Sequence, residues 1–133
     1  MNEPASPLVL RSDRNGVSTL TLNRPEALNA LSPLMFEELQ SHLDQLAANA
    51  SEVGVVILTG EGRSFSAGND LKAIERGEHA STPHQQAETL DLIEAMPQPV
   101  IASVKGHCYT GALDLALACD LLICANDARF CDT

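Results

Sequence analysis

The sequence contains no tryptophan, and aromatic residues make up only 3% of its 133 positions. These residues are Phe36, Phe65, Tyr109 and Phe130. A hydrophobic core therefore has to be built from leucine, valine, isoleucine and alanine. Proteins that bind single-stranded nucleic acid commonly stack the bases on aromatic side chains, so this scarcity argues against such a function.

Positive charge is also scarce. Eight lysine and arginine residues oppose eighteen aspartate and glutamate residues, which gives a net charge of −10 at pH 7. An acidic surface repels phosphate backbones and anionic lipids at long range, so we expect neither a nucleic acid nor a membrane as partner. A small anionic ligand remains compatible with this charge, because a pocket can be locally positive.

Long apolar runs are missing too. No stretch approaches the roughly 20 residues that a membrane-spanning helix needs, and residues 1–7 lack the basic and apolar regions of a secretory signal. We therefore expect a cytoplasmic protein. The four cysteines, at 108, 119, 124 and 131, form no C-x-x-C pair, and we interpret them as buried free thiols rather than metal ligands. With 44% apolar residues, the composition indicates one modest globular domain or part of a larger one.

The first half of the chain begins with two alternating apolar runs. They flank an Asn-Gly pair at 15–16, which predicts a β-hairpin over residues 8–22. A Ser-Pro pair at 32–33 is typical of a helix start, and leucines at helical spacing predict an amphipathic helix over 33–49.

An apolar run over 53–59 predicts a buried strand of a parallel sheet. We expect a loop over 60–69, a short helix beginning near Asp70, a polar loop over 77–82 and a helix over 83–95. In this interpretation a strand, a glycine-bearing loop and a helix follow one another.

The same order then repeats. A strand is expected over 99–104, a glycine-bearing loop over 105–111, a helix over 112–119 and a strand over 120–125. This repetition indicates an α/β fold with right-handed crossovers. Residues 128–133 resemble a short strand without a following helix, so we expect the chain to be part of a longer protein.

Two explanations suit the two glycine-bearing loops. Phosphate binding is weakly supported, because the first loop lacks the third glycine of a dinucleotide fingerprint and no G-K-[ST] follows it. Alternatively, residues 67–70 and 110–112 each open a helix, and their unpaired N–H groups stabilise one developing oxyanion. The glycines can also serve close packing alone.

Asp114 is the sharpest candidate for chemistry. It follows Gly111 by three residues, which places both on one helix face, and its neighbours are small or apolar. Burial there would disfavour the charged form of the carboxyl group, which would help it to exchange protons with a substrate. A carboxylate can also stand near a helix start for the sake of the helix dipole. Asp120, at the junction of helix and strand, is expected to be a structural turn residue.

Three stretches together carry a family resemblance. They are LNRPEALNAL at 22–31, GRSFSAGNDL at 62–71 and GHCYTGALDLALACD at 106–120, followed by ARF at 128–130. In this order they resemble the crotonase superfamily, also called the enoyl-CoA hydratase/isomerase family. The resemblance implies an α/β crotonase-like spiral of repeated ββα units, incomplete in this chain. Residues 1–133 would form its N-terminal portion, with the C-terminal portion absent.

The resemblance also implies an acyl-CoA substrate and a homotrimer or hexamer for a full-length protein. No separate cofactor is expected, because coenzyme A is part of the thioester. The backbone N–H groups of Asn69 and Gly111 would hold the thioester oxygen, and Lys72 would offset phosphate charge. The implied substrate contacts are Ala27, Leu28, Ala67, Gly68, Asn69, Asp70, Leu71, Lys72 and Gly111.

In hydratases of this family two glutamates activate and deliver water. Asp114 stands at the first of these positions, and the second falls at or immediately beyond Thr133. The resemblance thus implies an enoyl-CoA hydratase, with Asp114 as acid and base. Two alternatives stay open: an enoyl-CoA isomerase or other enolate chemistry, and, in a different class, a non-catalytic acyl-CoA-binding or assembly module.

Overall fold

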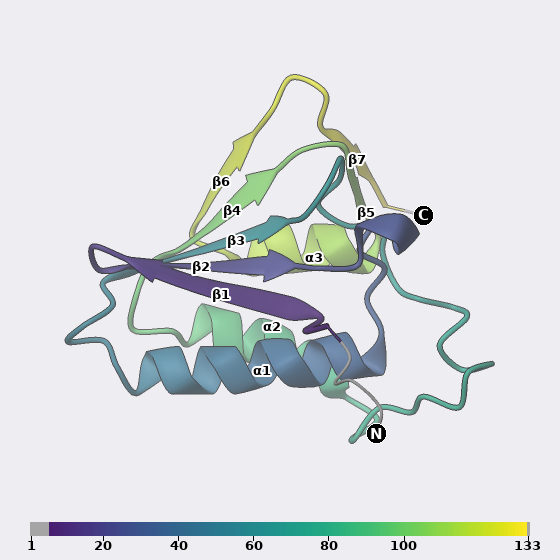
Figure 1. Ribbon diagram of the computed structural model, residues 1–133, viewed down its shortest axis with the longest axis horizontal. Coiled ribbons are helices and arrows are strands. Elements are labelled where there is room, and N and C mark those ends of the chain that lie inside the picture. The colour runs from purple at the N-terminus through teal and green to yellow at the C-terminus, as the bar shows by residue number, and fades with distance from the viewer. Residues whose placement is uncertain (1–5, 133) are drawn as a thin grey trace.

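The main sheet has five strands in the order β1-β2-β3-β4-β6 (Figure 1). The structure, a computed structural model, describes residues 6–132. Strand β1 runs antiparallel to β2, and all other neighbours in the sheet are parallel. The strands are β1 (Val9–Arg14), β2 (Val17–Leu22), β3 (Val55–Gly60), β4 (Val100–Val104) and β6 (Leu121–Cys124).

The predicted hairpin is confirmed. Arg14 pairs with Val17 at its end, and Asn15 and Gly16 between them both have positive φ, at 51° and 78°. Positive φ at both central residues is what a tight hairpin with right-handed twist requires, and asparagine and glycine adopt it at low cost. The Asn-Gly pair thus sets the register of β1 and β2.

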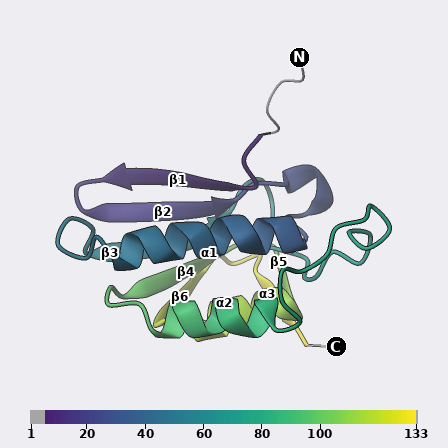
Figure 2. The same cartoon turned by 90° about the horizontal axis from the view of Figure 1, so that it is seen from below.

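Three α-helices lie within the described residues: α1 (Pro33–Ala47), α2 (Gln85–Glu94) and α3 (Gly111–Ala118). A single 3₁₀ turn, η1 (Pro25–Ala27), follows β2. The Ser32 hydroxyl caps α1 by accepting a hydrogen bond from the Met35 N–H at 3.2 Å. Helices α1 and α2 lie side by side beneath the sheet (Figures 1 and 2).

The core lies between this helix layer and one face of the sheet. Strands β2, β3 and β4 bury every second residue, while the residues between are only half-buried. The strand expected over 53–59 is confirmed as a strand of a parallel sheet, but only one of its faces is buried, because helices cover only one side of the sheet. Helix α1 fills the core with Met35, Phe36, Leu39, Leu43 and Leu46, and Leu34 at its start is exposed.

A second, two-stranded sheet stands beside the first. Strand β5 (His107–Tyr109) pairs in parallel with β7 (Arg129–Cys131). Residues 107–109 were expected to form a loop, which is wrong. Their strand depends on partners distant in sequence, since Ser66 donates its N–H to His107 O at 2.9 Å and accepts from Tyr109 N–H at 3.2 Å. Of the strand expected over 128–133, Thr133 lies outside the described residues.

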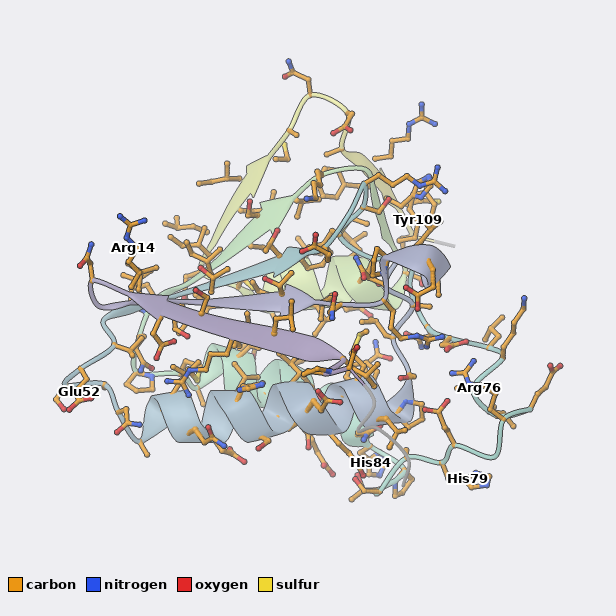
Figure 3. All side chains as sticks on the ribbon, in the orientation of Figure 1. Arg14, Glu52, Arg76, His79, His84 and Tyr109 are labelled. Carbon is orange, nitrogen blue, oxygen red and sulfur yellow. The ribbon has the colours of Figure 1, made fainter. Side chains whose placement is uncertain are left out.

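The short helix expected from Asp70 is also wrong, because residues 71–77 form successive turns. The Asp70 carboxylate accepts a hydrogen bond from the Lys72 N–H at 3.1 Å and forms ion pairs with Arg24 and Arg76. Gly77, at φ 81°, then redirects the chain. Tertiary ion pairs thus fix this segment as a loop. The whole loop at 70–84 projects past the start of α1, with Arg76, His79 and His84 along it (Figure 3).

The free cysteines differ in exposure. Cys108 is buried and Cys119 is half-buried, and burial raises the pKa of Cys108 to about 11 and that of Cys119 to about 12. Cys124 and Cys131 are exposed, so the expectation of four buried thiols is wrong for these two. All of β6 is exposed as well. No helix within residues 6–132 is long and apolar enough to cross a bilayer.

Candidate functional site

The backbone amide of Asn69 is oriented by an isolated parallel bridge between Leu31 and Asn69. Leu31 donates its N–H to Gly68 O at 2.8 Å and accepts from Asp70 N–H at 2.9 Å. Both bonds use the neighbours of Asn69, so its own N–H points away from Leu31. That N–H has no hydrogen-bond acceptor among the described residues. The expectation that a helix start presents this amide is wrong; a strand-like bridge presents it instead.

The amide of Gly111 is presented by a helix start, as expected from the sequence. Gly111 is the first residue of α3, so its N–H has no preceding turn of helix to bond to. No acceptor for it occurs within residues 6–132. Thr110, before it, has φ 48° and ψ −111°, a conformation that a β-branched residue rarely adopts. This turn takes the backbone from β5 directly into α3.

The segments that carry these two amides touch each other. A Cβ atom at Gly68 would overlap the Thr110 Oγ1 atom and lie only 2.8 Å from Tyr109 O. A Cβ atom at Gly111 would overlap the Asn69 Oδ1 atom. At Gly68 the positive φ and the nearby Tyr109 carbonyl favour glycine strongly, whereas at Gly111 the absent side chain leaves room for the Asn69 and Gln86 side chains. The structure thus brings Gly68, Asn69 and Gly111 together, although about forty residues of chain separate them.

Asp114 lies one turn into α3, on the side of Gly111. Its side chain is exposed, so the expected burial of this carboxylate is wrong for this chain. It accepts a hydrogen bond from the Gln86 Nε2 atom at 3.3 Å. Gln86 in turn accepts from the Asn69 Nδ2 atom at 3.1 Å. A side-chain network therefore connects Asn69 to Asp114 through Gln86, a residue of α2.

Two residues at the site were missed by the sequence reasoning. Gln86 is one, and no local pattern distinguishes it from the neighbouring glutamine. The other is the buried Asn29, whose Nδ2 donates to Glu61 O at 2.9 Å and to Ser64 O at 3.0 Å. Asn29 has φ 53°, and asparagine adopts positive φ more readily than most residues. An asparagine within a turn is therefore the sequence signal that could have pointed to it. Asn29 joins the turn after β2 to the loop before Asn69.

The expected substrate contacts Ala27 and Leu28 lie close to this loop. Leu28 has φ 50°, and its carbonyl accepts from the Ala67 N–H at 2.9 Å. The Ser66 hydroxyl donates to Asn29 O at 2.7 Å and accepts from the Gly68 N–H at 3.2 Å. The structure therefore places the turn at 27–29 directly beside the segment that ends in Asn69.

Asp70 is engaged within the protein. Its side chain is only 7% exposed, and it pairs with Arg24 at 2.8 Å and with Arg76 at 2.7 Å. Burial opposes ionisation of this carboxyl group, but the hydrogen bonds from Arg76 and Arg24 outweigh burial and lower the pKa of Asp70. Leu71 and Lys72 beside it are exposed. Asp120 accepts from the Val100 N–H at 2.7 Å, consistent with a structural turn residue.

A mainly apolar pocket of about 280 Å³ opens beside Asn69. The loop at 70–84 forms one wall, and the starts of α1 and α2 form the other. Its lining residues are Leu31, Pro33, Phe36, Asn69, Asp70, Leu71, Ala73, Ile74, Ala80, Pro83, Gln85 and Gln86. A larger pocket of about 640 Å³ includes Arg24 and Arg76 but neither Asn69 nor Gly111. The smaller pocket is therefore the one that adjoins the candidate site.

Sequence comparison places the chain among known proteins. The family model described as enoyl-CoA hydratase/isomerase matches residues 12–133. A protein of Bacillus subtilis named probable enoyl-CoA hydratase is 42% identical over 117 residues, which are 85% of this chain and 45% of that protein. A protein of Arabidopsis thaliana named probable enoyl-CoA hydratase 1, peroxisomal, is 34% identical over 124 residues, 93% of this chain and 46% of that protein.

Comparison with solved structures leads to the same family. The enoyl-CoA hydratase/isomerase from Xanthobacter autotrophicus Py2 is 39% identical and superposes with a TM-score of 0.87, covering 94% of this chain and 48% of that one. A monofunctional enoyl-CoA isomerase from Mycobacterium smegmatis is 36% identical, with a TM-score of 0.79 over 94% of this chain and 53% of that one. The chain thus spans about half the length of the relatives it matches. Its mixed α/β architecture is that of the crotonase fold, and the chain belongs to the enoyl-CoA hydratase/isomerase family.

Proposed function

We propose that the protein acts on acyl-CoA thioesters as an enoyl-CoA hydratase. The observation that carries this proposal is the contact between the segments of Asn69 and Gly111, each of which presents an N–H without an acceptor among residues 6–132. Asp114 stands one helical turn from Gly111. Two donors and one carboxylate are the parts needed to form and protonate an enolate.

The thioester oxygen would accept hydrogen bonds from both N–H groups. Attack by water at C3 moves electrons from the double bond toward this oxygen, so the donors stabilise the charge as it develops. Removing one donor of this kind from an oxyanion hole costs roughly 3 kcal/mol of barrier. The Asp114 carboxylate would take a proton from the attacking water, and a proton added at C2 completes the reaction. By resemblance, a carboxyl group at the family's second catalytic position, which falls immediately beyond Thr133, would supply it.

The apolar pocket beside Asn69 would hold the acyl chain. It begins at the residue whose N–H would bind the thioester oxygen, so a chain attached to that carbonyl can enter it directly. Its walls are mainly aliphatic, which suits hydrocarbon better than a polar acyl group. Coenzyme A would enter as part of the substrate, past Ala27 and Leu28, with no separate cofactor. In a full-length protein of this family we expect a homotrimer or hexamer.

Isomerase chemistry is the second candidate. Asp114 is the one carboxylate hydrogen-bonded in the network with Asn69 and Gln86 among the described residues. A single carboxylate can remove a proton from C2 of a 3-enoyl thioester and return it at C4, with no water consumed. The likeness to the enoyl-CoA isomerase of Mycobacterium smegmatis favours this alternative specifically.

Ultraviolet absorbance distinguishes these reactions. With 2-butenoyl-CoA, a hydratase removes the conjugated double bond and the absorbance falls; with 3-hexenoyl-CoA, an isomerase creates the conjugation and the absorbance rises. Asp114→Asn should abolish either change while calorimetry still detects binding of the thioester. Asp91→Asn, at an exposed site on α2, is the matched control. Thioester binding without any absorbance change would instead indicate a binding module, and absence of binding would refute the proposal.

A further inference from the structure

Gln86 lies between Asn69 and Asp114 and uses both ends of its amide. Its Oε1 accepts from Asn69 Nδ2 at 3.1 Å, and its Nε2 donates to Asp114 Oδ2 at 3.3 Å. This orientation is the one that suits both partners, because a carboxylate can only accept and an Nδ2 group can only donate. The Gln86 side chain therefore joins Asn69, which carries the first candidate oxyanion donor, to the Asp114 carboxylate.

The backbone of Gln86 is held in place by the residue before it. Gln85 is buried, and its Nε2 donates to Pro33 O at the start of α1 at 3.1 Å. The carbonyl of Gln85 accepts from Gln40 Nε2 at 3.1 Å and from Thr89 Oγ1 at 2.8 Å. The first turn of α2 is thus tied to α1, so the position from which Gln86 extends is fixed.

The Gln86 amide also packs on Gly111. A Cβ atom at Gly111 would lie 3.1 Å from Gln86 Nε2, so the amide rests where a side chain at position 111 would begin. Among residues 6–132, Gln86 alone donates a hydrogen bond to the exposed carboxylate of Asp114. The rotamer of Asp114 is therefore restrained by the contact with Gln86, which lies beside Gly111 at the start of α3.

From this geometry we propose that Gln86 is a positioning residue, which holds the Asp114 carboxylate beside the oxyanion donors so that it faces the reacting carbons. The proposal rests on the proposed function, because it assigns Asp114 to proton transfer. Gln86 also lines the apolar pocket, so an acyl chain bound there would contact the residue that orients the acid. Proton transfer depends steeply on distance and alignment, so a free carboxylate should transfer protons more slowly.

The test uses deuterium exchange at C2 of butanoyl-CoA in heavy water. This exchange needs only the oxyanion donors and one base: the Asp114 carboxylate removes a C2 proton, the enolate forms, and a deuteron returns to C2. Gln86→Leu should lower kcat about tenfold or more while KM stays within about threefold. Gln45→Leu is the matched control, because Gln45 is exposed on α1, outside both the candidate site and the apolar pocket.

A second variant separates positioning from packing. Gln86→Glu keeps the size of the side chain but replaces the Nε2 donor by an acceptor, so the Asp114 carboxylate loses its donor and is repelled while both carboxyl groups are ionised. Its kcat should be low at neutral pH and recover as the pH falls, which a purely structural residue would not cause. Nuclear magnetic resonance adds a readout without turnover: the side-chain amide signals of Gln86 should change position in Asp114→Asn, because Nε2 then loses its charged acceptor.

The outcomes are distinct. Active wild-type protein with unchanged kcat and pH profile in both Gln86 variants overturns the inference alone. Amide signals of Gln86 that ignore the Asp114→Asn substitution overturn it as well. A wild-type protein that neither binds nor exchanges any acyl-CoA overturns the proposed function, and the inference falls with it.

Discussion

The backbone of Gly68 lies against the side chain of Thr110, so closely that a Cβ atom at position 68 would overlap Thr110 Oγ1. Gly68 also has φ 102°, a conformation that other residues rarely adopt. This contact fixes how the segment carrying the Asn69 amide meets the segment carrying the Gly111 amide. The candidate oxyanion site therefore depends on Gly68, whose own N–H and carbonyl are both hydrogen-bonded within the protein.

Gly68→Ala tests this dependence. Gly77→Ala is the matched control, because Gly77 has φ 81° but no atom within 4 Å of the added Cβ. Both variants should lose about 1 kcal/mol of unfolding free energy through backbone strain, and Gly68→Ala should lose about 1–3 kcal/mol more through overlap. Urea unfolding measures the difference. Equal losses in the two variants would show that the contact with Thr110 is not tight.

Gly111→Ala should behave differently, because the added Cβ meets a side chain rather than backbone. Asn69 Oδ1 can move aside, and alanine suits the first turn of a helix, so we expect a change in unfolding free energy below about 1 kcal/mol. The displaced Asn69 and Gln86 side chains should nevertheless lower turnover. Asn69→Ala keeps the backbone N–H of residue 69 and removes Oδ1, the atom that the added Cβ would meet. It therefore tests the same contact through its second partner.

A double-mutant cycle makes that comparison quantitative. If Asn69 Oδ1 is what the new Cβ strikes, the two substitutions should be non-additive in their effect on thioester binding, with a coupling of about 0.5 kcal/mol or more. Binding can be followed by the red shift of a conjugated thioester such as cinnamoyl-CoA, which reports polarisation of its carbonyl. Additive effects would mean that the two side chains do not meet.

Asp70 should make the stability of the protein dependent on pH in the acid range. Its pKa in the folded protein is lowered from the ordinary value of 3.8, so the group contributes stability that is fully present above that value. This stability is lost as the pH falls through the lowered folded pKa. Asp70→Asn should therefore be less stable than wild type at pH 7, and the difference should shrink below about pH 4.

Thermal unfolding between pH 2 and 7 measures this dependence. Asp44→Asn is a suitable control, because Asp44 is exposed on α1 and has no ion pair among the described residues. A constant difference between wild type and Asp70→Asn across the whole range would contradict the assigned ion pairs with Arg24 and Arg76. The arginines themselves stay charged throughout, so the ion pairs of Asp70 are lost by protonation of its own carboxylate.

The parts of the fold that the sequence predicts are those with local causes. The hairpin follows from the Asn-Gly pair at 15–16, and α1 follows from Ser32, Pro33 and the spacing of its leucines. Strand β5 could not be predicted, because three residues become a strand only through Ser66 and β7, which are distant in sequence. The helix expected to begin near Asp70 is absent for a similar reason, because the Asp70 carboxylate is bound by Arg24, 46 residues away.

The candidate site divides in the same way. A helix start leaves N–H groups free, so the segment 110–112 could be proposed from its position, whereas Gly111 itself was assigned by resemblance. Asn69 could be proposed by resemblance, but the bridge to Leu31 that orients its amide has no local signature. Gln86 could not be found at all, because its role depends on two partners that flank α2 in space but not in sequence.

The apolar pocket gives a prediction for substrate choice. Ala80 is exposed on the loop at 70–84 and lines the pocket, so Ala80→Leu should add bulk inside it without disturbing the core. We expect kcat/KM for octenoyl-CoA to fall about tenfold relative to wild type, while kcat/KM for butenoyl-CoA changes less than about twofold. The shorter chain should end before Ala80, whereas the longer chain should reach it.

Ala87→Leu provides the matched control. Ala87 is exposed on α2, seven residues further along, and does not line the pocket. The same increase in size there should leave both substrates unaffected. If Ala80→Leu lowered kcat/KM equally for butenoyl-CoA and octenoyl-CoA, the loop would be acting on the oxyanion donors rather than on the acyl chain. If neither substrate were affected, the acyl chain would have to occupy a different part of the protein.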